Sequence, residues 1–188
     1  GLQRQQAEVW NSGKTLSGQQ NYIQFAGKDL LPGTRYYWTV KTWDKDGVAG
    51  PYAAPQYFDT GLFGAKDWEN AIWIKRETRD MNNYTYFRKN FELKGKSIKR
   101  AIVYLSVQQQ YELYLNGRLV GKGSSFHYPQ YAYYNAYDVT PYLSTKNVIA
   151  SKAHWFGGGQ GRAKSAPGMI MKMVVEYSDG SQTVIGTD

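Results

Sequence analysis

The sequence predicts an all-β fold built from two sandwich-like units, residues 1–62 and 63–188. Aromatic residues make up 16% of the chain, with 17 Tyr and 6 Trp, and flat rings suit half-buried pleated surfaces. The 20 glycines indicate many tight turns. Several stretches alternate apolar and polar residues, and no helical periodicity persists over three turns.

The first unit is predicted to consist of short strands joined by turns. A Pro-Gly turn at Pro32-Gly33 precedes its strongest strand signal, residues 36–43, in which Tyr36, Trp38 and Val40 share one face. The other expected elements are a brief strand at 22–25, a turn at 44–47 and a final strand at 57–60.

This unit resembles the last strands of a fibronectin type III sandwich. The turn that typifies such domains is matched by Leu30, Pro32, Gly33, Thr34 and Tyr36. Tyr36 falls at the place of the corner tyrosine, so we expect its hydroxyl to bond to the upstream backbone. A complete sandwich of this type has about 100 residues and seven strands. The unit is therefore expected to be truncated, and the chain to be an excerpt of a longer protein.

The second unit is predicted to follow a junction at residues 62–67 and to open at 68–74. Strands are expected at 84–93 and 98–107, and hairpins at 111–121 and 171–185. The first hairpin turns at Asn116-Gly117, where both residues tolerate positive φ. Strands spaced 8–12 residues apart predict a sandwich or jelly roll. We expect a jelly roll that is galactose-binding-like.

Composition excludes several classes of site. The chain has no cysteine and only two histidines, His127 and His154, so thiolate and histidine metal sites are not expected. The net charge of +8 raises nucleic-acid binding as an alternative, but the basic residues are scattered and no recognition motif accompanies them. No apolar run approaches the roughly 20 residues of a membrane span.

No complete catalytic motif is present. Gly13-Lys14-Thr15 matches the end of a phosphate-binding loop, but Glu8 stands where the motif requires glycine. Glycoside hydrolysis needs two carboxylates about 5–9.5 Å apart, and no convincing pair stands out among the 15 acidic residues. Asp138, after Tyr137, is predicted to be a turn or capping residue. The catalytic residues are thus expected to lie outside this chain.

Two segments are candidates for contact with carbohydrate or with another domain. Residues 128–137 contain five tyrosines, and residues 157–162 form a glycine-rich loop after an aromatic triplet. Aromatic faces beside polar groups suit sugars, although core packing and a plain inter-strand loop explain the same residues. The candidate contact residues are His127, Tyr128, Tyr131, His154, Trp155, which would serve as a platform, and Arg162.

Several phrases, taken in order, resemble the N-terminal region of bacterial α-L-rhamnosidases. They cover nearly the whole chain. They are Val9 to Lys14, Pro32 to Gly47, Asp67-Trp68 with Trp73-Ile74, Tyr111 to Gly121, Tyr134 to Thr140, and Glu176 to Ser181.

The resemblance implies a non-catalytic accessory segment ahead of a catalytic domain that hydrolyses terminal α-L-rhamnosides of glycans. It implies a scaffold that also contacts a rhamnose-containing glycan, in the periplasm or outside the cell. No family catalytic residue can be carried onto this sequence, and no cofactor is expected. Calcium stays an open alternative that no residue pattern in the sequence supports. Two alternatives remain open: a stand-alone carbohydrate-binding or adhesive module, and a basic nucleic-acid-binding β domain.

Overall fold

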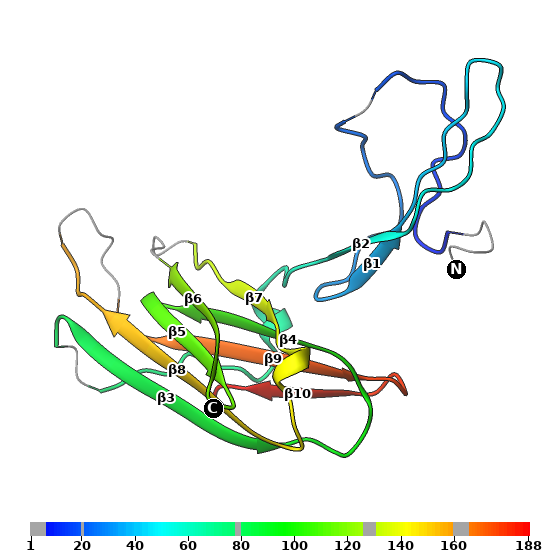
Figure 1. Cartoon of the computed structure of the whole chain (residues 1–188). Helices are drawn as coiled ribbons and strands as arrows, with labels where there is room; N and C mark the ends of the chain where they lie inside the picture. Colours follow the sequence, from blue (N-terminus) through cyan, green and yellow to red (C-terminus); the bar gives the residue numbers. More distant parts are fainter. Residues whose placement is uncertain (1–6, 20, 78–79, 126–130, 160–165) are drawn as a thin grey trace. The chain divides into compact units, whose positions relative to one another are not determined.

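The computed structural model describes residues 7–19, 21–77, 80–125, 131–159 and 166–188 (Figure 1). These residues confirm the predicted all-β fold, since they form strands and only two short 3-10 helices. The chain divides into two compact units, Gly1–Asp67 and Trp68–Asp188. The predicted domain boundary after residue 62 stays a prediction. No helix in the described part is long and apolar enough to cross a bilayer.

The first unit contains β1 (Arg35–Trp38) and β2 (Gln56–Asp59), and η2 (Ala65–Trp68) ends at the start of the second unit. The remaining elements all lie in the second unit. They are β3 (Asn83–Glu92), β4 (Ile98–Val107), β5 (Gln109–Leu115), β6 (Arg118–Ser125), β7 (Asn135–Asp138), η3 (Thr140–Tyr142), β8 (Lys146–Trp155), β9 (Met169–Tyr177) and β10 (Gln182–Gly186).

The first unit is held by the antiparallel pair β1–β2. Arg35 lies opposite Asp59, and its guanidinium donates two hydrogen bonds of 2.9 and 2.7 Å to that carboxylate. The Tyr36 and Phe58 rings stack on the same pair of strands, with centroids 5.6 Å apart. The Leu31 N–H donates to the Tyr36 hydroxyl at 2.8 Å, which confirms the corner bond expected from the sequence.

Two expected strands of the first unit are wrong in part. The predicted strand at 36–43 is shortened to β1, because the facing segment contains Pro51 and Pro55, which have no N–H to continue the ladder. Residues 22–25 are irregular rather than a strand, and the side chains of Tyr22, Ile23 and Phe25 are exposed. A strand requires a partner for its backbone groups, and β1 and β2 pair only with each other.

The second unit is a sandwich of two antiparallel four-stranded sheets. The front sheet has the order β3–β8–β5–β6, and the back sheet has the order β10–β9–β4–β7. Leu105 and Met173 from the back sheet, and Leu113 and Ile149 from the front sheet, belong to one buried apolar cluster. The expected strands at 84–93 and 98–107 and both hairpins are confirmed, with Asn116 and Gly117 at φ 51° and 78°.

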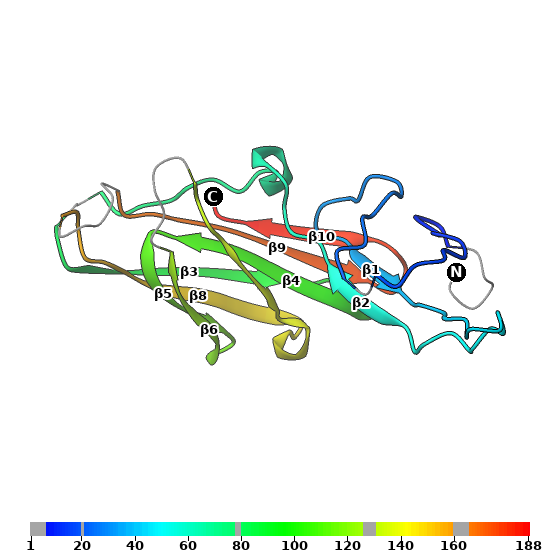
Figure 2. The same cartoon turned by 90° about the horizontal axis from the view of Figure 1, so that it is seen from above.

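The outer face of the back sheet is covered by other parts of the second unit. Tyr104 is buried beneath Tyr134, whose ring meets that of Trp68 edge-on, and Ser106 donates to the Tyr133 carbonyl oxygen. Figure 2 shows the chain beyond η2 running along the back sheet on the side away from β5 and β6. The outer face of the front sheet therefore remains as the broad surface open to a ligand.

Candidate functional site

The open surface of the front sheet, here called the front face, carries aromatic and polar side chains in two rows. The strand register places Tyr84, His154 and Gln110 in one row. It places Tyr86, Lys152, Glu112 and Lys122 in the next. Alternation along each strand directs these side chains away from the core. Tyr84 and Tyr86 are 46% and 74% exposed, so both rings are accessible.

His154 is held between two aromatic rings. Its imidazole lies parallel to the Tyr84 ring with centroids 4.0 Å apart, and the Phe156 ring is tilted against it at the same distance. Nε2 lies 2.8 Å from the Asn82 amide oxygen. Because an amide oxygen only accepts, this contact is a hydrogen bond donated by the Nε2–H of His154. Partial burial, followed by the charge of Lys152, lowers the pKa of His154 below its ordinary value of 6.5.

The second row contains an ion pair and an additional cation. Glu112 accepts hydrogen bonds from Tyr114 at 2.6 Å and from Lys122 at 2.9 Å, and these contacts lower its pKa. The Lys152 ammonium lies 5.1 Å from the centroid of the Tyr84 ring, a cation–π distance. The front face therefore combines aromatic rings with an amide, a carboxylate and two ammonium groups.

Part of the front face lines a shallow pocket of about 430 Å³. Its lining includes Tyr84, Gln110, Glu112, Lys122, Lys152 and His154. Small-molecule sites typically occupy roughly 300–1,000 Å³. Sugars have apolar C–H faces that pack on aromatic rings and hydroxyl groups that bond to amides and charged groups. The front face has both kinds of partner on a rigid sheet. This chemistry suits binding rather than hydrolysis. Glu112 is the only carboxylate among the described residues of the two rows, and hydrolysis of a glycosidic bond needs two.

A second pocket, of about 250 Å³, opens between the two sheets. Its lining includes Phe87, Leu105, Met169 and Met171. The hydroxyl of Ser151, also in the lining, is buried without a hydrogen-bond partner among the described residues. The pocket is mainly a gap in the apolar core, and it lies on the opposite side of the front sheet from the front face.

The residues expected to contact carbohydrate fall in different places. His154 lies in the front face. Trp155 follows it on the opposite side of β8 and is 9% exposed, so it offers little ring surface as a platform. Tyr131 is 66% exposed but lies before β7, in the chain leading to the back sheet. His127, Tyr128 and Arg162 lie outside the described residues, so their contact roles stay predictions.

Most front-face residues were not anticipated from the sequence. Tyr84, Tyr86 and Lys152 sit at alternate positions of strands that were expected, so alternation alone marks them as facing away from the core. The sequence does not reveal that β3 and β8 are neighbours, because residues 93–145 separate the two strands along the chain. Without that pairing, Tyr84 and His154 cannot be assigned to one site.

Most acidic residues of the second unit have structural partners. Six pair with lysine or arginine side chains of the sandwich, within 4.0 Å: Glu69, Glu92, Glu112, Glu176, Asp179 and Asp188. Asp138 accepts hydrogen bonds from the backbone N–H and the hydroxyl of Thr140, which confirms its expected turn role. A Lys96 contact lowers the pKa of Asp179. A general acid of a glycosidase requires a raised pKa instead.

The described residues contain no group of three or more His, Cys, Asp or Glu side chains placed to hold a metal ion.

Two family matches account for most of the chain. Residues 2–64 match the Rha78A-like, N-terminal immunoglobulin domain, and residues 96–188 match the α-L-rhamnosidase N-terminal domain. The fibronectin type III likeness expected for the first unit agrees with an immunoglobulin domain in architecture, because both are sandwiches of this kind.

Individual relatives agree with these matches. An α-L-rhamnosidase of Formosa agariphila is 34% identical over 170 residues, which cover 77% of this chain and 18% of the relative. The structure of an α-L-rhamnosidase from Dictyoglumus thermophilum superposes with a TM-score of 0.83 and 30% identity, covering 100% of this chain and 23% of that one. An α-L-rhamnosidase from Aspergillus terreus gives a TM-score of 0.78 at 25% identity, covering 96% and 24%. The chain thus spans about a fifth of the length of these relatives.

Proposed function

The chain belongs to the α-L-rhamnosidase family and matches two of its N-terminal domains. We propose that it is the non-catalytic front segment of an enzyme that hydrolyses terminal α-L-rhamnosides. One observation supports the non-catalytic role above the others. The acidic residues of the sandwich form ion pairs and turns, as Glu112 does with Lys122 and Asp138 does with Thr140. Hydrolysis would be carried out by parts of the enzyme outside these residues.

The sandwich serves as a scaffold in this proposal and also contacts the glycan. The front face supports the second role, because the exposed part of the Tyr84 ring lies in the same pocket as the amide of Gln110. A rhamnose ring would lie against the exposed part of Tyr84, with its hydroxyls near Gln110. A glycan substrate of this class places the protein in the periplasm or outside the cell, and that location rests on the substrate class alone.

Calorimetric titration of the 188-residue chain with a rhamnose-containing disaccharide tests the contact role. We expect weak binding, with Kd around 1 mM, equivalent to about 4 kcal/mol. Tyr84→Ala should weaken it about tenfold, because the ring beneath the sugar is lost. Tyr22→Ala, which removes a 92% exposed tyrosine of the first unit, is the matched control and should leave binding unchanged. If no heat is detected at millimolar sugar, the contact role is wrong and only the scaffold role remains.

A stand-alone carbohydrate-binding module is the second candidate, since it would use the same front face. Both candidates predict sugar binding by the isolated chain. They differ in whether the natural polypeptide continues into a catalytic domain, and mass measurement of the native protein separates them.

A further inference from the structure

The central cation of the front face, Lys152, differs in its surroundings from the other cation in its row. Lys122 is neutralised by Glu112 at 2.9 Å. Lys152 lies between Tyr86 and Glu112 in the register, yet within the described residues no carboxylate comes within 4.0 Å of its ammonium. The Lys152 ammonium instead lies 5.1 Å from the centroid of the Tyr84 ring. The pocket therefore has a surplus positive charge at its centre.

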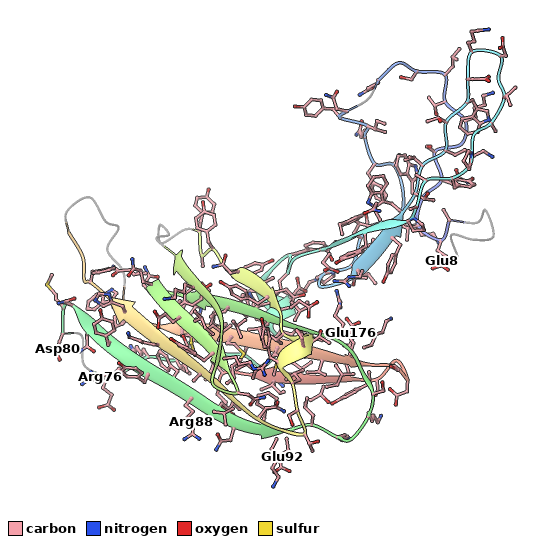
Figure 3. All side chains as sticks on the ribbon, in the orientation of Figure 1. Glu8, Arg76, Asp80, Arg88, Glu92 and Glu176 are labelled. Carbon is pink, nitrogen blue, oxygen red and sulfur yellow. The ribbon has the colours of Figure 1, made fainter. Side chains whose placement is uncertain are left out.

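The charge of Lys152 acts on both neighbours. Burial first, and then the charge of Lys152, lower the pKa of His154, because an adjacent positive charge disfavours the imidazolium. The hydrogen bonds from Tyr114 and Lys122 do most to lower the pKa of Glu112, and Lys152 is the smallest cause of that shift. Arg88, two positions from Tyr86 on the same side of β3, adds a third cation beside Lys122 and Lys152, and Figure 3 shows it extending away from the sandwich. Against these three cations, the described residues of the two rows contain one carboxylate, Glu112.

We propose that the front face binds an acidic saccharide, with the carboxylate of a uronic acid residue at the Lys152 ammonium and an adjoining sugar ring on Tyr84. This inference rests on the proposed function and adds the class of glycan. A charge-assisted hydrogen bond at Lys152 gives the acidic sugar an advantage over its neutral counterpart. The aromatic ring supplies the C–H contact that distinguishes a sugar from a simple anion.

Two disaccharides that differ in one group test the proposal. α-L-Rhamnosyl-D-glucuronate and α-L-rhamnosyl-D-glucose share ring shape and linkage, and only the first carries a carboxylate. In calorimetric titration of the whole 188-residue chain, the glucuronate compound should bind about tenfold more tightly at low salt. That preference should shrink in about 0.5 M NaCl, where exposed charges are screened within a few ångströms.

Variants at two lysines of β8 test whether the preference for the glucuronate compound comes from Lys152. Lys152→Met should abolish the preference, so that the glucuronate compound and the neutral compound bind the variant with equal affinity. Lys146→Met is the control, since Lys146 lies on the same side of the same strand with its side chain 82% exposed, far from the pocket. Circular dichroism verifies that both variants fold, and the salt dependence of the unmodified chain provides a test independent of the variants.

The results separate this inference from the proposed function. Equal binding of both disaccharides, abolished by Tyr84→Ala, would overturn the acidic preference and leave sugar contact intact. Failure of both to bind would overturn the contact and this inference together. Tighter binding of a single-stranded DNA oligomer than of the glucuronate compound would also overturn it, because aromatic rings and lysines can hold nucleic acid as well.

Discussion

The hydroxyl groups of Tyr111 in β5 and Tyr137 in β7 lie 2.8 Å apart and join the two sheets of the sandwich. The Asn135 amide donates to the Tyr111 hydroxyl at 2.6 Å, so the contact belongs to a small polar network. β5 and β7 are in different sheets, and the network closes the edge where β6 faces β7. A buried polar network of this kind fixes how the two sheets register against each other.

Removing one hydroxyl tests the network. Tyr137→Phe should lower the free energy of unfolding by about 0.5–1.5 kcal/mol, because Tyr111 is 3% exposed and loses one of its two partners. Urea unfolding followed by fluorescence measures this change. Tyr86→Phe on the front face is the control and should stay within about 0.5 kcal/mol of the unmodified chain. Equal effects of the two variants would mean that the hydroxyl pair adds nothing.

Stability at alkaline pH should depend on Tyr111. Burial, and then the hydrogen bond with Tyr137, raise the pKa of Tyr111 well above its ordinary value near 10. The folded chain keeps this proton while the unfolded chain releases it, so the contribution is complete below pH 10 and declines as the pH rises above 10. Tyr111→Phe should show a shallower decline in unfolding free energy above pH 10. The same slope in both proteins would contradict the assignment.

Glycine at position 121 is required by the Tyr137 ring. A Cβ added at Gly121 would lie 2.3 Å from a ring carbon of Tyr137, so the ring or the strand would have to move. Gly121→Ala should cost about 1–3 kcal/mol. Gly95→Ala is the matched control, because nothing lies within 4 Å of its added Cβ. Thermal unfolding of both variants compares them, and a Gly121→Ala midpoint equal to that of the control would show that the ring has room to move.

Two ion pairs of the sandwich should contribute very differently to the free energy of unfolding. The side chains of Arg100 and Glu176 are 7% and 22% exposed, whereas those of Lys146 and Glu92 are 82% and 70% exposed. Glu176→Ala should therefore cost about 3 kcal/mol, because it leaves a guanidinium buried without its carboxylate. Glu92→Ala, at a side chain that extends away from β3 in Figure 3, should change stability by less than about 0.5 kcal/mol. Chemical denaturation measures the unfolding free energy of both variants. Similar losses of stability in the two would refute the predicted difference.

Local signals in the sequence were sufficient for much of the fold. Asn116-Gly117 marked its hairpin because both residues adopt positive φ, and the turn before Tyr36 predicted the bond that its hydroxyl accepts from Leu31. The strand predicted at residues 22–25 was wrong, because apolar composition cannot show whether a partner strand is present. The prolines at 51 and 55 lay opposite the expected long strand, but their effect depends on a pairing that only the structure reveals.

The candidate site was harder to predict because it is assembled from separate strands. His154 was identified, and Trp155 was expected beside it as a sugar platform. Consecutive residues of a strand face opposite ways, so these two side chains could not share one surface. Tyr84 escaped notice because its stacking on His154 depends on the register between β3 and β8. Alternation predicts which side a residue faces, but it does not predict which strand lies next to it.

The most direct measurement is hydrolysis of an aryl α-L-rhamnoside by the 188-residue chain, followed by release of the coloured phenol. The account predicts no turnover above the uncatalysed rate, because the acids of its sandwich are occupied in ion pairs and turns. An enzyme containing the same segment together with its remaining domains should release the phenol under identical conditions. Sustained turnover by the 188 residues alone, lost on substitution of one of their own acids, would contradict the account.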